Sequence, residues 1–215
     1  NIPDDVDHII EPFVGNGDLL GFLTEKSKYT IETYDIDPKY VNAIKRDTLK
    51  NPPCYKGKFV LTNPPYLARN KSKNKALYDT YKCNDLYKCF MINLIKGNCK
   101  AGIIIIPLNF ISSIRKADVD IRKQFVEKYS ISILNIFEEQ VFDDTSYAVC
   151  SMLFKKRTSN DPMLIKTYVY PSKKKFDISL SKENNYTIGG EIYNLPQNSK
   201  LRIQRATKGT KEYIT

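Results

Sequence analysis

Short apolar runs alternate with stretches of helically spaced apolar residues through the first 157 residues of the chain. The short runs predict strands over 7–11, 30–36, 58–63, 101–107, 131–137 and 146–154, with a brief third strand that ends at Asp47. The helical spacing predicts helices over 17–26, from Asp37–Pro38 onward, within 86–102, and over 115–129. Strands that alternate with helices predict an α/β fold, in which a mostly parallel sheet carries helices on both faces. The last two predicted strands add a closing antiparallel hairpin.

The pattern changes after Lys155–Arg157, where the chain becomes turn-rich, polar and basic. We therefore expect a first domain over 1–157 and a small basic C-terminal segment over 158–215. Lys and Arg total 34 against 24 for Asp and Glu, which gives a net charge of +10. A positive field attracts polyanions, and Lys173–Lys175 and Lys200–Lys211 are candidate phosphate contacts.

Composition narrows the function classes. No run reaches the roughly 18 apolar residues of a spanning helix, and the first residues lack the features of a secretory signal. We expect an intracellular, cytoplasmic protein with no membrane partner. The five cysteines form no close pair, which argues against a disulfide framework or a zinc site. His8 is the single histidine, so chemistry that needs imidazole or a bound metal is not expected.

Three predicted strand ends carry residues suited to a nucleotide-containing cofactor, because ligands of open α/β sheets bind beyond the carboxyl ends of the strands. Gly15 permits close backbone approach, Asp35 is placed to bind ribose hydroxyls, and Asp47 is placed to accept from an adenine amino group. The first loop lacks the third glycine of the dinucleotide fingerprint, and Glu11 and Asp18 flank it. These carboxylates repel phosphate and favour a cofactor with an ammonium and a sulfonium, S-adenosylmethionine.

A fourth strand end carries the sequence NPPY, Asn63 to Tyr66. Taken alone, two prolines after a strand indicate an extended turn as readily as a catalytic loop. The three matching strand ends upstream favour the catalytic interpretation.

The ordered set EPFVGNG, YDIDP, RDTL, TNPPY, LYKCF, AGIIIIP and Val141–Phe142 resembles the amino-group DNA methyltransferases. The chain is most similar to the N6-adenine type in which the cofactor motif precedes NPPY and the target-recognition domain comes last. The resemblance covers roughly residues 7–157 and implies a Rossmann-like S-adenosylmethionine-dependent methyltransferase sheet. That family usually has a further cofactor-binding segment before the first strand, and a recognition domain larger than 158–215.

The resemblance also implies residue roles. The implied cofactor set is Glu11, Phe13 and Gly15 at the methionine end, Asp35 at the ribose, Ile36 and Asp47 at the adenine, with Thr48 beside them and Phe90 closing the pocket. The catalytic loop is Asn63, Pro64, Pro65 and Tyr66. Phe142 matches the aromatic residue that helps to hold the target base. From the chemistry of the residues themselves, we expect Tyr66 to stack on that base, and Lys71 and Lys73 of the basic loop after NPPY to touch DNA phosphate.

These roles predict methyl transfer to the N6 amino group of adenine in a base flipped out of double-stranded DNA. The expected partners are that DNA and a cognate restriction endonuclease or specificity partner. Four alternatives stay open from the residues alone: N4-cytosine methylation, methylation of RNA adenine, N5-methylation of protein glutamine, and a non-catalytic nucleic-acid-binding subunit.

Overall fold

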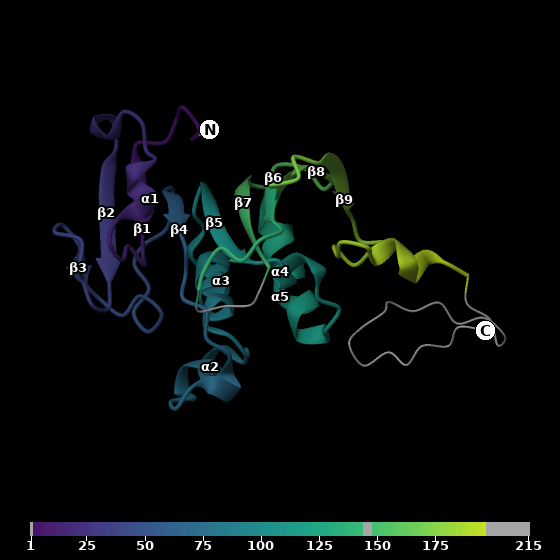
Figure 1. Cartoon of the computed structure of the whole chain (residues 1–215), viewed down its shortest axis with the longest axis horizontal. Coiled ribbons are helices and arrows are strands. Elements are labelled where there is room, and N and C mark those ends of the chain that lie inside the picture. Colours follow the sequence, from purple (N-terminus) through teal and green to yellow (C-terminus); the bar gives the residue numbers. More distant parts are fainter. Residues whose placement is uncertain (1, 144–147, 197–215) are drawn as a thin grey trace.

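One mixed sheet organises the protein, and the computed structural model describes residues 2–143 and 148–196 of it (Figure 1). Within these residues the sheet has nine strands in the order β3-β2-β1-β4-β5-β7-β6-β8-β9. The strands are β1 His8–Glu11, β2 Thr30–Asp35, β3 Ile44–Lys45, β4 Phe59–Thr62, β5 Ala101–Pro107, β6 Tyr129–Phe137, β7 Val149–Lys156, β8 Met163–Tyr170 and β9 Lys175–Leu180.

The parallel strands bring their carboxyl ends to one edge of the sheet. β1 pairs with β2 on one side and with β4 on the other, and β4 pairs with β5, all in parallel. The strand order therefore reverses beside β1, and ligands of open α/β sheets bind at such a point. β7 runs antiparallel between β5 and β6, and β9 closes the other edge antiparallel to β8. The predicted fold class is confirmed.

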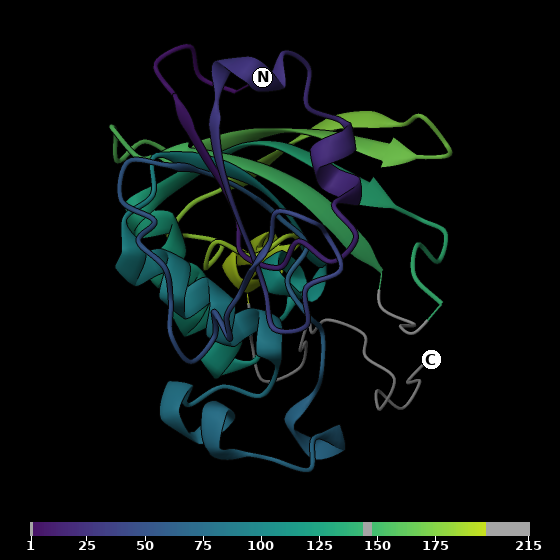
Figure 2. The same ribbon diagram turned by 90° about the vertical axis from the view of Figure 1, so that its left-hand side faces the viewer.

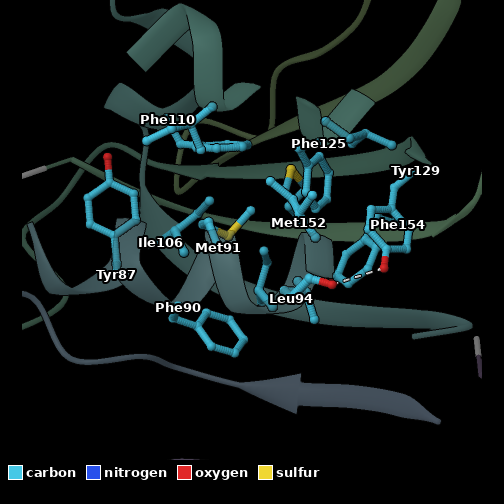
Figure 3. Close-up of a cluster of buried hydrophobic side chains, with 14 of the residues drawn as sticks. Tyr87, Phe90, Met91, Leu94, Ile106, Phe110, Phe125, Tyr129, Met152 and Phe154 are labelled. Atoms are coloured by element: carbon cyan, nitrogen blue, oxygen red, sulfur yellow. Dashed lines mark hydrogen bonds between the residues drawn. The ribbon is translucent and has the colours of Figure 1, made fainter. Parts of the chain in front are cut away.

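Two long helices, α3 Leu86–Gly97 and α5 Lys116–Lys128, cover one face of the sheet (Figure 2). Their apolar sides meet the sheet in the main core, where Phe125, Tyr129 and Phe154 pack ring against ring (Figure 3). Short helices complete this side: α2 Ala76–Tyr81 and α4 Asn109–Ser112, with 3-10 turns η2 Arg69–Lys71 and η3 Gly190–Asn194. None of the helices in the described residues is long and apolar enough to span a membrane.

The opposite face is covered more thinly. A second cluster gathers Ile9, Phe59 and Leu61 from the strands against Leu20 of the short helix α1 Asp18–Gly21. A 3-10 turn, η1 Lys26–Lys28, leads from α1 into β2.

The structure corrects three of the predicted elements. The helix expected over 17–26 spans only Asp18–Gly21; Phe22, the next residue, is 84% exposed and so contributes little packing that could hold a further turn. No helix follows Asp37–Pro38; the chain turns instead, and the Tyr40 N–H donates to the Gly15 carbonyl. The third strand is only Ile44–Lys45, so it stops short of Asp47.

Residues beyond 157 extend the same sheet. β8 pairs in parallel with β6, and its alternate residues Met163, Ile165 and Val169 are buried. The sheet therefore continues across the expected boundary at residue 157. A recognition role for 158–215 stays a prediction. Lys173–Lys175 lie exposed at the turn into β9, whereas Lys200–Lys211 lie outside the described residues. Residues 146 and 147 of the strand predicted over 146–154 also lie outside them.

Candidate active site

A cavity of about 470 Å³ opens at the carboxyl ends of β2 and β4. Seven of the residues expected at a cofactor or catalytic site line it: Phe13, Asp35, Ile36, Asp47, Thr48, Asn63 and Pro65. These seven residues lie at the carboxyl ends of four different strands, so the sheet brings residues of four separate sequence motifs to one cavity. A volume of this size suits a nucleotide-sized ligand.

The first loop folds tightly around Asp35. The two carboxylate oxygens of Asp35 accept hydrogen bonds from the Gly15 N–H and the Asp37 N–H, each at 2.9 Å. Gly15 has φ +54° and Gly17 has φ +88°, and a Cβ on Gly17 would lie 2.5 Å from the Tyr40 ring. Gly17 is required here, because a side chain at its φ would also collide with Tyr40, whereas the space beside Gly15 is open. Asp35 thus shapes the loop and also faces the cavity.

Glu11 lies behind this loop at the end of β1, with only 1% of its surface exposed. Both of its carboxylate oxygens are buried without a hydrogen-bond partner in the described part of the chain. Burial raises the pKa of Glu11 well above its usual range; the nearby Thr62 hydroxyl and Phe13 N–H oppose this, and the Asp35 charge adds to it. An unpartnered buried carboxylate is costly and is suited to binding a cation.

The remaining cofactor candidates divide into lining and supporting residues. Ile36 is 63% exposed within the cavity, so it offers an apolar surface for a ring. Asp47 accepts the Lys50 N–H at 3.1 Å and pairs with the Lys50 ammonium at 3.0 Å. Thr48 is buried, and its hydroxyl donates to the Pro12 carbonyl at 2.9 Å, which ties the loop after β3 to the first loop. Phe90 is fully buried under Phe13, at a ring distance of 5.3 Å, and does not line the cavity.

The NPPY loop leaves β4 directly toward the cavity. Pro64 is buried, while Asn63 and Pro65 reach the cavity wall. The Tyr66 hydroxyl lies 2.6 Å from Asn63 Oδ1 and 2.7 Å from the Ile105 carbonyl oxygen. One hydroxyl hydrogen can serve only one of these acceptors at a time. Burial raises the pKa of Tyr66, so the hydroxyl stays protonated and able to donate.

Phe142 lies next to the NPPY loop. Its ring centroid is 6.1 Å from that of Tyr66, and the Tyr87 ring also contacts Tyr66, at 6.2 Å between centroids. The structure therefore brings Phe142 to Tyr66. Lys71 and Lys73 are exposed on the loop after NPPY and do not line this cavity.

Sequence reasoning missed the residues that hold this loop. Asp85 is buried just before α3, and its carboxylate accepts the Leu67 N–H at 3.1 Å. The Tyr78 hydroxyl donates to the Leu67 carbonyl at 3.0 Å, and Leu77 and Tyr78 of α2 add a wall to the cavity. A six-residue helix is too short to give a clear period, and nothing in the sequence marks Asp85 as more than a helix cap.

The sheet order, the cavity beside β1 and the loop after β4 together define an S-adenosylmethionine-dependent methyltransferase fold. The chain belongs to the N-6 DNA methylase family, whose model matches residues 29–195. The resemblance seen in the motifs is thereby confirmed.

Solved structures of similar fold agree. A modification subunit ascribed to a type I restriction enzyme from Vibrio vulnificus YJ016 is 12% identical, with a TM-score of 0.59 over 84% of this chain and 52% of that one. A protein described as a class I S-adenosylmethionine-dependent methyltransferase from Listeria monocytogenes is 12% identical, with a TM-score of 0.58 over 78% and 59% of the two chains.

The methyltransferase subunit of a type I restriction-modification system from Streptococcus thermophilus is 16% identical, with a TM-score of 0.56 over 85% and 46%. The chain spans about half the length of these proteins. No curated protein sequence matches it.

Proposed function

We propose that this chain transfers a methyl group from S-adenosylmethionine to the N6 amino group of adenine in DNA. One observation carries the proposal: Asn63 and Pro65 of the NPPY loop line the same cavity as Asp35 and Ile36. A loop able to hold an amine therefore adjoins a site suited to the cofactor.

The residues present fit this cofactor. The unpartnered carboxylate of Glu11 suits the ammonium of its methionine part, with Phe13 and Gly15 beside it. Asp35 has further lone pairs for ribose hydroxyls, and Ile36 and Asp47 suit the adenine ring. When bound, S-adenosylmethionine supplies a methyl group on a positively charged sulfur.

The NPPY loop supplies the acceptors for the target amine. The lone pair of an exocyclic amine on adenine is delocalised into the ring, so the nitrogen is a poor nucleophile. If Asn63 Oδ1 and the Pro64 carbonyl each accept one N–H, they favour a pyramidal nitrogen whose lone pair is free to react. The two prolines stiffen the backbone, so that these acceptors are in place before the reaction.

The aromatic residues suit the base. Stacking of a base on an aromatic ring contributes about 1 to 3 kcal/mol, which offsets part of the few kcal/mol needed to flip a base out of the duplex. Tyr66 is held by its hydroxyl and by Tyr87, and Phe142 lies against it. We assign the base contact to Tyr66 with Phe142, and phosphate contacts to Lys71 and Lys73.

Membership of the N-6 DNA methylase family favours adenine in DNA over cytosine, RNA or protein glutamine as the target. The fold similarity to type I modification subunits supports a place beside a cognate restriction endonuclease or specificity partner, acting on double-stranded DNA.

The test is to identify the product. The chain is incubated with methyl-labelled S-adenosylmethionine and, separately, with duplex DNA, RNA and a glutamine-bearing release-factor substrate. We expect label in N6-methyladenine from DNA. Label found only in cytosine, in RNA or in the protein substrate would overturn the proposal.

A further inference from the structure

A second cavity, of about 600 Å³, lies on the other side of the segment that follows NPPY. Leu67, Ser72 and Asn74 of this segment face the cofactor cavity. Ala68, Arg69, Asn70 and Lys75 face the second cavity. The far walls come from the first residues of α3, the end of β5 and the start of α5. A single loop therefore separates the two cavities.

The charged side chains inside the second cavity have partners within the protein. Lys88 and Asp118 are both buried and form an ion pair, and Lys88 also donates to Asn84 Oδ1 at 2.8 Å. The Ser113 hydroxyl donates to the second oxygen of Asp118 at 2.6 Å. Asp85 is occupied by the Leu67 N–H, and burial raises its pKa. The two interior carboxylates thus have partners of their own.

The rim, by contrast, carries positive charge. Arg69 is paired with Asp79 at 2.8 Å. Lys75 and Arg115 are exposed, and within residues 2–143 and 148–196 neither side chain forms an ion pair. Asn70 and Asn109 stand exposed beside them and offer amide donors and acceptors. Cations with neighbouring amides are the groups that proteins use for phosphate and for base edges.

We propose that this second cavity binds a nucleotide adjacent to the target adenine on the same DNA strand, with its phosphate on Lys75 and Arg115. The inference rests on the proposed function, because a strand whose base enters the NPPY loop must place its neighbouring nucleotides beside that loop. Asn70 and Asn109 then face the neighbouring base.

The experiment measures binding, not catalysis. The probe is a fluorescent duplex of mixed sequence in which one adenine is mismatched, which eases its extrusion. The full chain is compared with the double variant Lys75→Gln/Arg115→Gln. The matched control is Lys26→Gln/Lys56→Gln, which removes the same charge from two exposed lysines. These lysines precede β2 and β4, so they lie at the amino ends of the strands, away from the two cavities.

We expect the Lys75/Arg115 variant to bind the duplex at least about fivefold more weakly than the control. For this variant, the slope of log affinity plotted against log salt concentration should be shallower by roughly 1.8, the contribution of two phosphate contacts. S-adenosylmethionine affinity should match that of the control by calorimetry. Equal affinity and slope in the two double variants would overturn the inference. A failure of the proposed function would be detected by a different experiment, the identification of the methylated product.

Discussion

At the scale of single residues, the site buries one ionisable carboxyl group, that of Glu11, where the ammonium of a cofactor would pair with it. Glu11 is buried with no partner for its carboxylate among the described residues, and its pKa is raised by burial. Between the pKa of the unfolded chain and the raised pKa of the folded protein, Glu11 is protonated in the folded protein and ionised in the unfolded chain. The free energy of unfolding contributed by this group falls as pH rises from the unfolded pKa toward the raised folded pKa.

Glu11→Gln should remove this pH dependence and raise the melting temperature of the cofactor-free protein at pH 7. The same change should weaken S-adenosylmethionine binding by about 1.5 to 3 kcal/mol, because a charged partner of the ammonium is lost. Melting curves from pH 4 to 8 and calorimetry check both effects. A variant that binds the cofactor as well as the parent chain would remove Glu11 from the site.

Two substitutions of Tyr66 distinguish the contribution of its aromatic ring from that of its hydroxyl group. Tyr66→Phe loses one hydrogen bond, to Asn63 or to Ile105, worth about 0.5 to 1.5 kcal/mol, and should keep much of the methyl transfer. Tyr66→Ala loses the stacking surface and should lose much of the activity. Single-turnover rates decide between them, and equal rates for the two variants would show that the ring does not hold the base.

At the scale of elements, Asp85 at the start of α3 holds the segment that follows NPPY. Asp85→Ala removes the acceptor of the Leu67 N–H, at a cost of about 0.5 to 1.5 kcal/mol in stability. Methyl transfer should fall by about tenfold, since the loop after NPPY loses its anchor. Asp85→Asn retains an acceptor and should restore both properties. A loss of stability with an unchanged rate would limit Asp85 to capping the helix.

Most elements follow from the sequence, and the failures have physical causes. The run Ala101–Pro107 predicted β5 correctly, because an unbroken β-branched stretch suits a strand in the middle of a sheet. β8 was missed although Met163, Ile165 and Val169 alternate with exposed residues, because the surrounding lysines made the region look like a solvated tail. The motifs predicted seven of the residues that line the cavity. They did not predict that α2 also lines it, because this contact depends on tertiary packing and not on the local spacing of apolar residues.

At the scale of the whole molecule, the sheet joins strands β8 and β9 to the part of the chain that contains the NPPY loop. Met163, Ile165 and Leu180 are buried in the main core, and each buried apolar side chain contributes about 1.5 to 3 kcal/mol. Three such losses are comparable with the entire stability of a domain.

A chain ending at residue 157 should therefore melt far below the full chain or aggregate, whereas a chain ending at residue 196 should melt close to it. Circular dichroism melting of the three chains checks this. A stable, cooperatively melting 1–157 chain would show that the expected domain boundary is a real one.

The central claim is that NPPY holds the amine of adenine for methyl transfer, and its most direct test is the single-turnover rate of Asn63→Ala on duplex DNA. Removing a preorganised hydrogen-bond partner of a transition state costs about 10² to 10³ in rate. We predict a loss of that size, with DNA affinity retained because phosphate contacts dominate binding. A folded Asn63→Ala variant that transfers methyl groups at a near-normal rate would contradict the account, and NPPY would be only a turn.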